Sequence, residues 1–479
     1  MSDNSKLVKR SRFWQLRIGD RRVILLIGDL TVALIALGIA LIYWGSSERF
    51  LGFSLEFLQK RTPIWFFFLP IVWLLLLIEL YDINKAGDWG KTIRGIFVAG
   101  AMGIVLYLLL YFYYFDPPKS LLPRRGVASF LIVVSLLTLL WRALYIRVFA
   151  ASHFMRRVLL VGGGKSGKLI LQIINKLNVK PFFLVGIVDD DPQKVGQLIE
   201  DYQVMGSSDD LLSLVEEQQI SDIIVAITGE MHGPMFQALL DTQERGVEIT
   251  RMPVAYEELL GRVPIQTLEA NWILRSFVDE TRVSSFFILG KRLLDILGGF
   301  LGVLGLMLVF PLVTIAILLD DGLPVIYGQV RSGRGGQSYR IIKFRTMRRD
   351  AEPDGHALIA RKNDERATRI GRILRKTHFD ELPQFLNVFR GDMSLVGPRA
   401  ERPELIQMFQ ERIPFYRARL LVKPGITGWA QVNQSYASTI DETITKLEYD
   451  LYYIKHRNLI MDMIILLRTP AMVLGFRGR

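Results

Sequence analysis

Four long apolar runs dominate the first third of the chain and set the first prediction. They cover residues 23–44, 63–80, 95–115 and 127–150. About 20 apolar residues in a helix are enough to cross the hydrocarbon core of a bilayer, so each run predicts a membrane-spanning helix. Basic residues precede the first run, and Arg156 and Arg157 follow the fourth. This pattern predicts that both ends of residues 1–152 lie in the cytoplasm.

Charged residues inside these runs need an explanation, because they are costly in lipid. Asp29 lies in the first run, and Arg142 and Arg147 lie in the fourth. Such residues either mark a polar path or make contacts between helices. For Asp29 we favour a polar contact between helices.

From Arg157 onward the pattern changes to alternating strands and helices. Residues 158–161, 182–188 and 220–226 are short apolar runs typical of parallel strands. A glycine-rich turn and a helix follow the first strand, and an acid ends the second, as in a Rossmann-type nucleotide site. The candidate nucleotide-binding residues are Gly162, Gly164, Gly167 and Asp189.

Two alternatives for the glycine-rich turn can be tested on the sequence. A phosphate-binding Walker loop requires Ser or Thr after Lys168, where the chain has Leu169. A sugar dehydratase would need a catalytic Tyr-x-x-x-Lys pair that follows the turn within this domain, and residues 153–283 contain none. Bound nucleotide and a purely scaffolding or regulatory role both stay open for residues 153–283.

A fifth apolar run, residues 293–319, contains Pro311. Proline removes a helix hydrogen bond and bends the axis. A straight span would place the remaining residues outside the cell, away from the middle domain. We therefore predict a re-entrant helix over residues 291–319, which breaks at Pro311 and returns to the same leaflet. A Pro-kinked helix that spans the membrane is the alternative.

The composition of the chain limits the classes of partner that it could bind. The 479 residues carry a formal net charge of +12 with a pI near 9.7, and the mean hydropathy is +0.28. Such a chain suits an anionic membrane surface or phosphate-bearing substrates. The sequence has no clustered basic and aromatic module of the kind that would predict nucleic-acid binding. The chain has no cysteine, which excludes disulfides, thiolate metal sites and cysteine nucleophiles.

The chemistry is concentrated after residue 324. Asp380 and Glu381 precede Pro383, which is suited to the first turn of a helix ending near Arg390. The surrounding sequence supplies the cations Lys343, Arg345, Arg375, Lys376 and Arg399. Carboxylates and cations without a His or Cys cluster suit Mg²⁺ and phosphoryl transfer, and a carboxylate can itself attack phosphorus. A solvated network of salt bridges is the structural alternative.

Four motifs of this section together resemble those of a known family. They are Lys-Phe-Arg-Thr-Met at 343–347, Asp-Glu-Leu-Pro-Gln at 380–384, Gly-Asp-Met-Ser-Leu-Val-Gly-Pro-Arg at 391–399 and Pro-Gly-Ile-Thr-Gly-Trp-Ala-Gln-Val-Asn at 424–433. The chain resembles the long form of the monotopic polyprenyl-phosphate hexose-1-phosphate transferases, which begin bacterial exopolysaccharide, capsule or O-antigen assembly. The resemblance covers residues 284–479. Ala400 and Gln434-Ser435 depart from the family pattern, and the second departure leaves the sugar open.

The resemblance implies roles for particular residues. Asp380 would be the nucleophile, and Glu381 its partner, with both as Mg²⁺ ligands. Pro311 would break the membrane helix. The implied substrate and phosphate ligands are Lys343, Arg345, Arg375, Arg399, Asp450 and Asp462.

The predicted architecture is a membrane α-helical bundle (1–152), a Rossmann-like α/β domain (153–283) and an α/β phosphoglycosyl transferase domain with the re-entrant helix (284–479). The resemblance implies transfer of hexose-1-phosphate from UDP-hexose to undecaprenyl phosphate, with release of UMP and a covalent aspartyl intermediate. It places the enzyme in the bacterial inner membrane, with its catalytic domain on the cytoplasmic face. A non-catalytic scaffold of polysaccharide assembly is the alternative, and the oligomeric state, including a homodimer, stays open.

Overall fold

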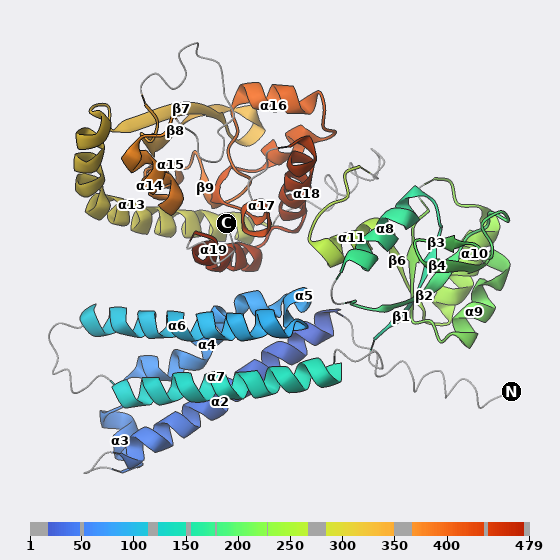
Figure 1. Ribbon diagram of the computed structural model, residues 1–479, viewed down its shortest axis with the longest axis horizontal. Coiled ribbons are helices and arrows are strands. Elements are labelled where there is room, and N and C mark those ends of the chain that lie inside the picture. Colours follow the sequence, from blue (N-terminus) through green and yellow to red (C-terminus); the bar gives the residue numbers. More distant parts are fainter. Residues whose placement is uncertain are drawn as a thin grey trace. The chain divides into compact units, whose positions relative to one another are not determined.

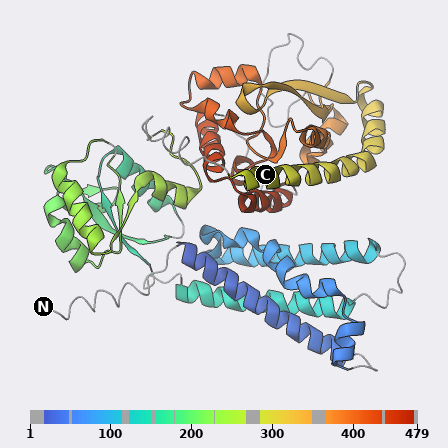
Figure 2. The same ribbon diagram turned by 180° about the vertical axis from the view of Figure 1, so that it is seen from behind.

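The computed structural model describes residues 18–47, 52–113, 123–149, 155–177, 180–227, 229–266, 284–348, 366–434 and 439–473. Two compact units contain them, Met1–Met252 and Pro253–Arg479. The first unit holds a helical section and an α/β section, and the second holds a larger α/β assembly (Figures 1 and 2). Each is described by itself.

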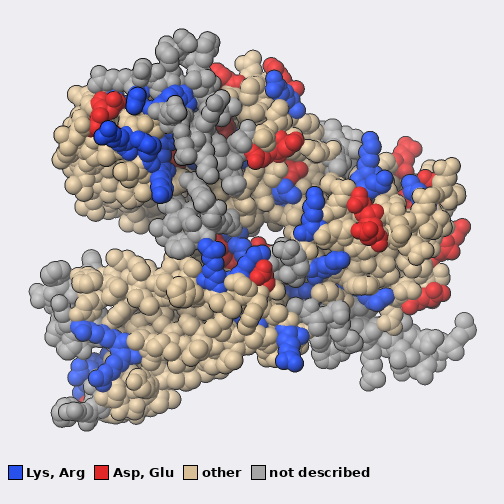
Figure 3. Space-filling view, in the orientation of Figure 1, with Lys and Arg blue, Asp and Glu red and all other residues tan. Residues whose placement is uncertain are grey.

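The N-terminal section is helical. Its elements are α2 (Ile18–Ser46), α3 (Leu55–Lys60), η1 (Ile64–Phe68), α4 (Leu69–Leu76), η2 (Ile78–Tyr81), α5 (Ile83–Ala86), α6 (Trp89–Tyr113) and α7 (Arg124–Phe149). Within the described residues, α2, α6 and α7 are long and apolar enough to cross a membrane. On the face seen in Figure 3, this section is almost free of charged side chains between two charged ends.

The predicted second span, 63–80, is not one long helix. It is divided among η1, α4 and η2, and its apolar helical stretch, Ile64–Leu76, is shorter than the other three. Pro70 accounts for part of the break, because proline fits the first turn of α4 and cannot donate the bond that would continue a helix through it.

A buried ion pair joins the first and last of these helices. Asp29 on α2 and Arg142 on α7 are 0% exposed, and Arg142 Nη2 donates to Asp29 Oδ2 at 2.6 Å. Arg142 Nη1 also donates to the Leu80 carbonyl at 3.0 Å. Asp29 therefore makes the polar contact between helices that its position in an apolar run suggested.

The middle section is a six-stranded sheet in the order β3-β4-β2-β1-β5-β6. Its elements are β1 (Arg157–Val161), α8 (Lys165–Lys176), β2 (Phe183–Val188), β3 (Leu198–Ile199), β4 (Tyr202–Gly206), η5 (Ser208–Asp210), α9 (Leu211–Glu217), β5 (Asp222–Val225), α10 (Gly233–Glu244) and β6 (Glu248–Arg251). The strands pair in parallel except β3, which runs antiparallel to β4. This Rossmann-like order confirms the predicted strands.

The second unit combines two small sheets with helices. Its elements are α11 (Met252–Leu260), α13 (Ser285–Asp321), β7 (Ile326–Ser332), η6 (Arg334–Gly336), β8 (Ser338–Phe344), α14 (Arg369–Thr377), η7 (Phe379–Glu381), α15 (Gln384–Arg390), β9 (Ser394–Val396), α16 (Pro403–Gln410), η8 (Tyr416–Leu421), β10 (Gly425–Thr427), α17 (Trp429–Asn433), α18 (Ile440–His456) and α19 (Leu459–Val473). β7 and β8 are antiparallel, and β9 and β10 are parallel. Pro383 stands directly before α15, as predicted.

The long helix α13 contains Pro311 and bends visibly in Figures 1 and 2. Its two halves are each attached to the rest of the unit. Near its start, buried Asp295 accepts the Ser394 hydroxyl and the Leu395 N–H, both at 2.9 Å. Gly302 faces α15, where an added Cβ would lie 2.2 Å from the Phe385 ring. The absence of a side chain there lets the two helices approach closely.

Candidate active site

Two adjacent carboxylates lie where α14 gives way to α15. α14 ends at His378, which adopts a left-handed conformation (φ 59°) and turns the chain into the short helix η7. This turn carries Asp380 and Glu381 into the protein, where their exposed fractions are 8% and 9%. Two acids at this depth require cationic or hydrogen-bonding partners.

Glu381 has such partners on two other segments. Lys343 Nζ, from β8, donates to Glu381 Oε1 at 2.8 Å. Arg399, which follows β9, donates from Nη2 to Oε1 at 2.5 Å and from Nη1 to Oε2 at 3.4 Å. Burial alone would raise the pKa of Glu381, but Arg399 and Lys343 outweigh it and hold the pKa well below its ordinary value. Glu381 is therefore an anion at neutral pH.

Asp380, in contrast to Glu381, has a raised pKa and an oxygen without a partner in the part of the chain that the structure describes. This oxygen is the buried Oδ1. Burial, and then the negative charge of Glu381, raise the pKa of Asp380 to about 6, against the opposing pull of Lys343, Arg399 and Arg375. The carboxylate is mostly ionised at pH 7, and its buried Oδ1 is poorly solvated and has no partner among the described residues. These conditions favour a nucleophile.

The other predicted phosphate ligands lie in different surroundings. Arg345 is 7% exposed, and its guanidinium binds the carbonyls of Asp321, Gly322 and Leu323 at the end of α13 at distances of 2.6–3.0 Å. In the contacts described, it does not reach the acid pair. Arg375, in the last turn of α14, is near enough to lower the pKa of Asp380.

The two later acids are buried in ion pairs. Asp450 is 2% exposed and accepts from Arg419 Nη2 at 2.9 Å. Asp462 is 0% exposed and accepts from Lys291 Nζ at 2.7 Å and from the Tyr453 hydroxyl at 2.8 Å. Neither carboxylate contacts the acid pair in the part of the chain that the structure describes. Their assignment as substrate ligands, like that of Arg345, stays a prediction.

Arg419 is the residue that sequence reasoning missed. It is 4% exposed, and its Nη2 also donates to the Arg399 carbonyl at 3.0 Å. It thereby links Asp450 to the backbone of the residue that holds Glu381. Arg419 stands in an apolar stretch, Ala418 to Val422, which is the one local signal that could have marked it as buried.

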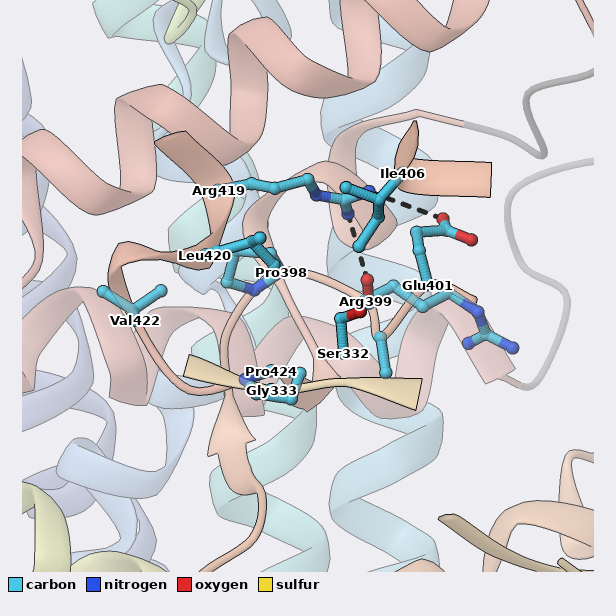
Figure 4. A pocket seen from close by; sticks show the side chains of 11 residues that line it. Ser332, Gly333, Pro398, Arg399, Glu401, Ile406, Arg419, Leu420, Val422 and Pro424 are labelled. Carbon is cyan, nitrogen blue, oxygen red and sulfur yellow. Dashed lines mark hydrogen bonds and ion pairs between the residues drawn. The ribbon is translucent and has the colours of Figure 1, made fainter. Parts of the chain in front are cut away.

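A pocket adjoins Arg399 and Arg419. Its empty volume of about 230 Å³ includes open solvent, so it is a small surface hollow and not an enclosed cavity. Figure 4 shows Arg419 reaching toward Glu401 and the Arg399 carbonyl, with Leu420 and Val422 on the left of the view. The lining therefore combines charged and apolar side chains.

The residues present fit a magnesium ion that completes its shell from substrate. Within the described residues, no group of three or more His, Asp or Glu side chains is arranged to hold a metal. Mg²⁺ commonly takes one or two carboxylates and fills its remaining positions with phosphate oxygens and water. The unpartnered Asp380 Oδ1, beside the Glu381 carboxylate, supplies such a donor set.

The glycine turn of the middle section folds as a Rossmann turn. Gly162 has φ +99°, and a Cβ on Gly167 would lie 2.0 Å from the Gly162 carbonyl oxygen, so the helix can approach the strand only with glycine there. Gly164 is the N-cap of α8.

The Asp189 side chain is hydrogen-bonded to this turn. Its Oδ2 accepts the Gly163 N–H at 2.7 Å, its Oδ1 accepts the Asp191 N–H at 2.9 Å, and Lys194 lies 3.3 Å from both oxygens. Burial opposes ionisation, but these donors hold the pKa of Asp189 below its ordinary value. The carboxylate therefore already accepts one backbone N–H of the glycine turn, and nucleotide binding at this turn stays a prediction.

Comparison with known proteins gives the class. The fold and the site define an α/β protein with apolar helices long enough to cross a membrane and with a buried acid pair beside cations. Residues 286–476 match the model of the bacterial sugar transferase family, and residues 77–253 match that of a CoA-binding domain. A UDP-glucose:undecaprenyl-phosphate glucose-1-phosphate transferase of Caulobacter vibrioides is 40% identical over 189 residues, 39% of this chain and 70% of that protein. The chain belongs to the bacterial sugar transferase family.

Longer relatives match as well. A UDP-N-acetylgalactosamine-undecaprenyl-phosphate N-acetylgalactosaminephosphotransferase of Aeromonas hydrophila is 41% identical over 227 residues, 47% of this chain and 52% of that protein. An undecaprenyl-phosphate glucose phosphotransferase of Komagataeibacter xylinus is 30% identical over 327 residues, 66% of this chain and 58% of that protein. In these two alignments the chain spans little more than half the length of the relative.

Proposed function

We propose that this protein transfers a sugar 1-phosphate from a UDP-hexose to undecaprenyl phosphate and releases UMP. The observation that carries the proposal is the buried Asp380 carboxylate beside the cation-bound Glu381, since its Oδ1 has no hydrogen-bond partner among the described residues. The names of the relatives agree on this donor and acceptor and differ in the sugar, so the hexose is left open.

The proposed reaction has two steps. The Asp380 carboxylate attacks the phosphorus that bears the sugar, forming an acyl-phosphate bond while the bond to UMP breaks. The phosphate of undecaprenyl phosphate then attacks the same phosphorus, and the acyl bond breaks to give the lipid diphosphate sugar and free Asp380. Lys343, Arg375 and Arg399 would balance the negative charge of the diphosphate in both steps.

Asp380 and Glu381 would also hold Mg²⁺. When bound, the ion supplies Lewis acidity toward phosphoryl oxygens and orients the leaving group. Glu381 remains ionised in its cationic setting, so it would keep its charge for the metal throughout the cycle.

The reaction is tested by UMP release. Purified protein in lipid nanodiscs is supplied with undecaprenyl phosphate and, in turn, UDP-glucose, UDP-galactose and their N-acetyl forms. We expect UMP from one or two donors, and, without acceptor, a labelled sugar phosphate attached to Asp380. A label mapped to another residue would refute the nucleophile assignment. No UMP with any donor would favour the non-catalytic scaffold.

We also propose that α13 is re-entrant, with both its ends at the cytoplasmic face of the bacterial inner membrane. The contacts at its two ends support this. Lys291 near its start binds Asp462, while at its end Asp320 accepts the Ile370 N–H at 2.8 Å. Both partners belong to the same α/β unit, and the bend at Pro311 would let the helix return to it.

The topology can be tested with single cysteines, since the chain has none of its own. Phe286→Cys near the start of α13 and Gln337→Cys beyond its end are at exposed positions, and Leu55→Cys is at the exposed first residue of α3, after α2. In inside-out vesicles, an impermeant thiol reagent should label the first two and spare the third. Labelling of residues 286 and 337 from opposite sides would show a spanning helix.

A further inference from the structure

The first residues of the second unit, 253–266, form a strap that packs against α18 and the core of that unit. Val263 and Ile265 are 0% and 3% exposed, within the same hydrophobic core as β9 and α18. The Val263 N–H donates to the Glu448 carbonyl at 3.1 Å, and the Trp429 indole N–H donates to the Gly261 carbonyl at 2.9 Å. The strap is thus built into the unit that carries the candidate active site.

Buried polar contacts fix the strap to α18. The Tyr256 hydroxyl donates to Glu448 Oε2 at 3.1 Å, and Arg262 lies 3.5 Å from the same oxygen. Tyr256 and Glu448 are 4% and 6% exposed. A second contact joins Glu257 to Lys455 at 3.1 Å and to His456 at 2.8 Å. Ion pairs and hydrogen bonds at this depth hold two elements in one register, because breaking either leaves a buried charge unpaired.

The opposite side of α18 faces the active site. Asp450 is two residues after Glu448, about 200° further around the helix. It binds Arg419, which donates to the Arg399 carbonyl, and Arg399 holds Glu381. Contacts therefore run without a gap from Tyr256 through α18 to the acid pair.

We propose that the strap is a positioning element of the transfer reaction: by fixing α18 at Glu448, it sets Asp450 and Arg419, which hold Arg399 on Glu381. Tyr256, Glu448, Asp450 and Arg419 are positioning residues, since none touches the acid pair. This inference rests on the proposed function. Placement within a fraction of an ångström matters for a group that orients reacting phosphates.

The variants are chosen to separate positioning from folding. Tyr256→Phe removes one hydroxyl and keeps the ring, and Glu448→Ala removes the acceptor. Glu448→Gln keeps an acceptor for Tyr256 without the charge. Burial raises the pKa of Glu448 to about 7, against the pull of Arg262, so a neutral side chain at this position is a state the native fold already visits. Val254→Ala, at an exposed position of α11, is the matched control.

The full-length protein is assayed for UMP release and for thermal unfolding. We expect Tyr256→Phe and Glu448→Ala to lower kcat about 3- to 10-fold, with the KM for the UDP-sugar within about 2-fold. Glu448→Gln and Val254→Ala should stay within about 2-fold of the wild type. Because the contacts act in series, adding Tyr256→Phe to Asp450→Asn should lower kcat little further than Asp450→Asn alone.

The outcomes distinguish the two proposals. If Tyr256→Phe and Glu448→Ala lower the unfolding temperature but leave kcat unchanged, the strap is only structural and the inference is wrong. Additive losses in the double variant would also overturn it, since the contacts would then act independently. If Glu448→Ala does not fold, Tyr256→Phe decides alone. No UMP from the wild-type protein refutes the proposed function itself, and the strap's role with it.

Discussion

Replacing Asp380 with Asn should stabilise the protein while abolishing transfer. The amide has nearly the shape of the carboxylate but carries no charge to bury beside Glu381 and cannot form an acyl-phosphate. Raising the pKa of Asp380 from its ordinary value of 3.8 to about 6 corresponds to roughly 3 kcal/mol of unfavourable burial of the ionised form. Since Glu381 shares that interaction, we expect the Asp380→Asn variant to recover about 1–3 kcal/mol at pH 7.5.

The sign of the pH dependence follows from the direction of the shift. A carboxyl whose pKa is higher in the folded state lowers the free energy of unfolding at pH values above that pKa. As the pH falls from about 6 to 3.8, this destabilisation disappears. The unfolding temperature of Asp380→Asn should therefore exceed that of the wild type at pH 7.5. The difference should nearly vanish by pH 4, where Asp380 in the folded wild-type protein is protonated and neutral.

Thermal unfolding in one detergent, followed by tryptophan fluorescence between pH 4 and 7.5, measures this directly. Glu381→Gln is the informative counterpart, because Glu381 has a lowered pKa and two cations depend on its charge. It should be less stable than the wild type at pH 7.5. If Asp380→Asn is the less stable of the two, the electrostatic description of the pair is wrong.

Three further outcomes are expected. The kcat/KM for the UDP-sugar should fall about tenfold per pH unit below pH 6, because the protonated Asp380 cannot attack; a flat profile down to pH 5 would contradict this. UMP release should stop in excess chelator and return with added Mg²⁺, so full activity in chelator would remove the metal. Lys343→Met should lower kcat/KM on the order of 100-fold, whereas Lys376→Met, at an exposed position of α14, should not.

Elements governed by local periodicity were predicted well. The parallel strands of the middle section, the turn at Gly162 and the helix after Pro383 all follow from short-range patterns. The structure of the second apolar run was not predicted well, because hydropathy counts apolar residues and does not show where a helix breaks. Its length allowed a span, whereas Pro70 starts a new helix inside it.

Side-chain partners distant in sequence could not be read from the motifs. Lys343 and Arg345 stand two apart, and in a continuing strand they would share one face. β8 ends at Phe344, however, and beyond it the Arg345 guanidinium binds the end of α13, while Lys343 reaches Glu381. Arg419 and the strap were missed for the same reason, since most of their partners are distant in sequence, with Glu257 and His456 as much as 199 residues apart.

The family resemblance implies which acid of the pair attacks, and the structure adds a physical reason for that order. An Asp-Glu dipeptide gives two carboxylates of similar ordinary pKa, and the residue types alone do not say which attacks. In the fold, Lys343 and Arg399 both bind Glu381, which lowers its pKa, while Asp380 keeps an unpartnered oxygen and a raised pKa. Neighbouring acids whose pKa values are driven apart have different tasks. A carboxylate committed to two cations is a poor nucleophile, so the geometry supports Asp380 as the attacking group and Glu381 as the fixed anion beside it.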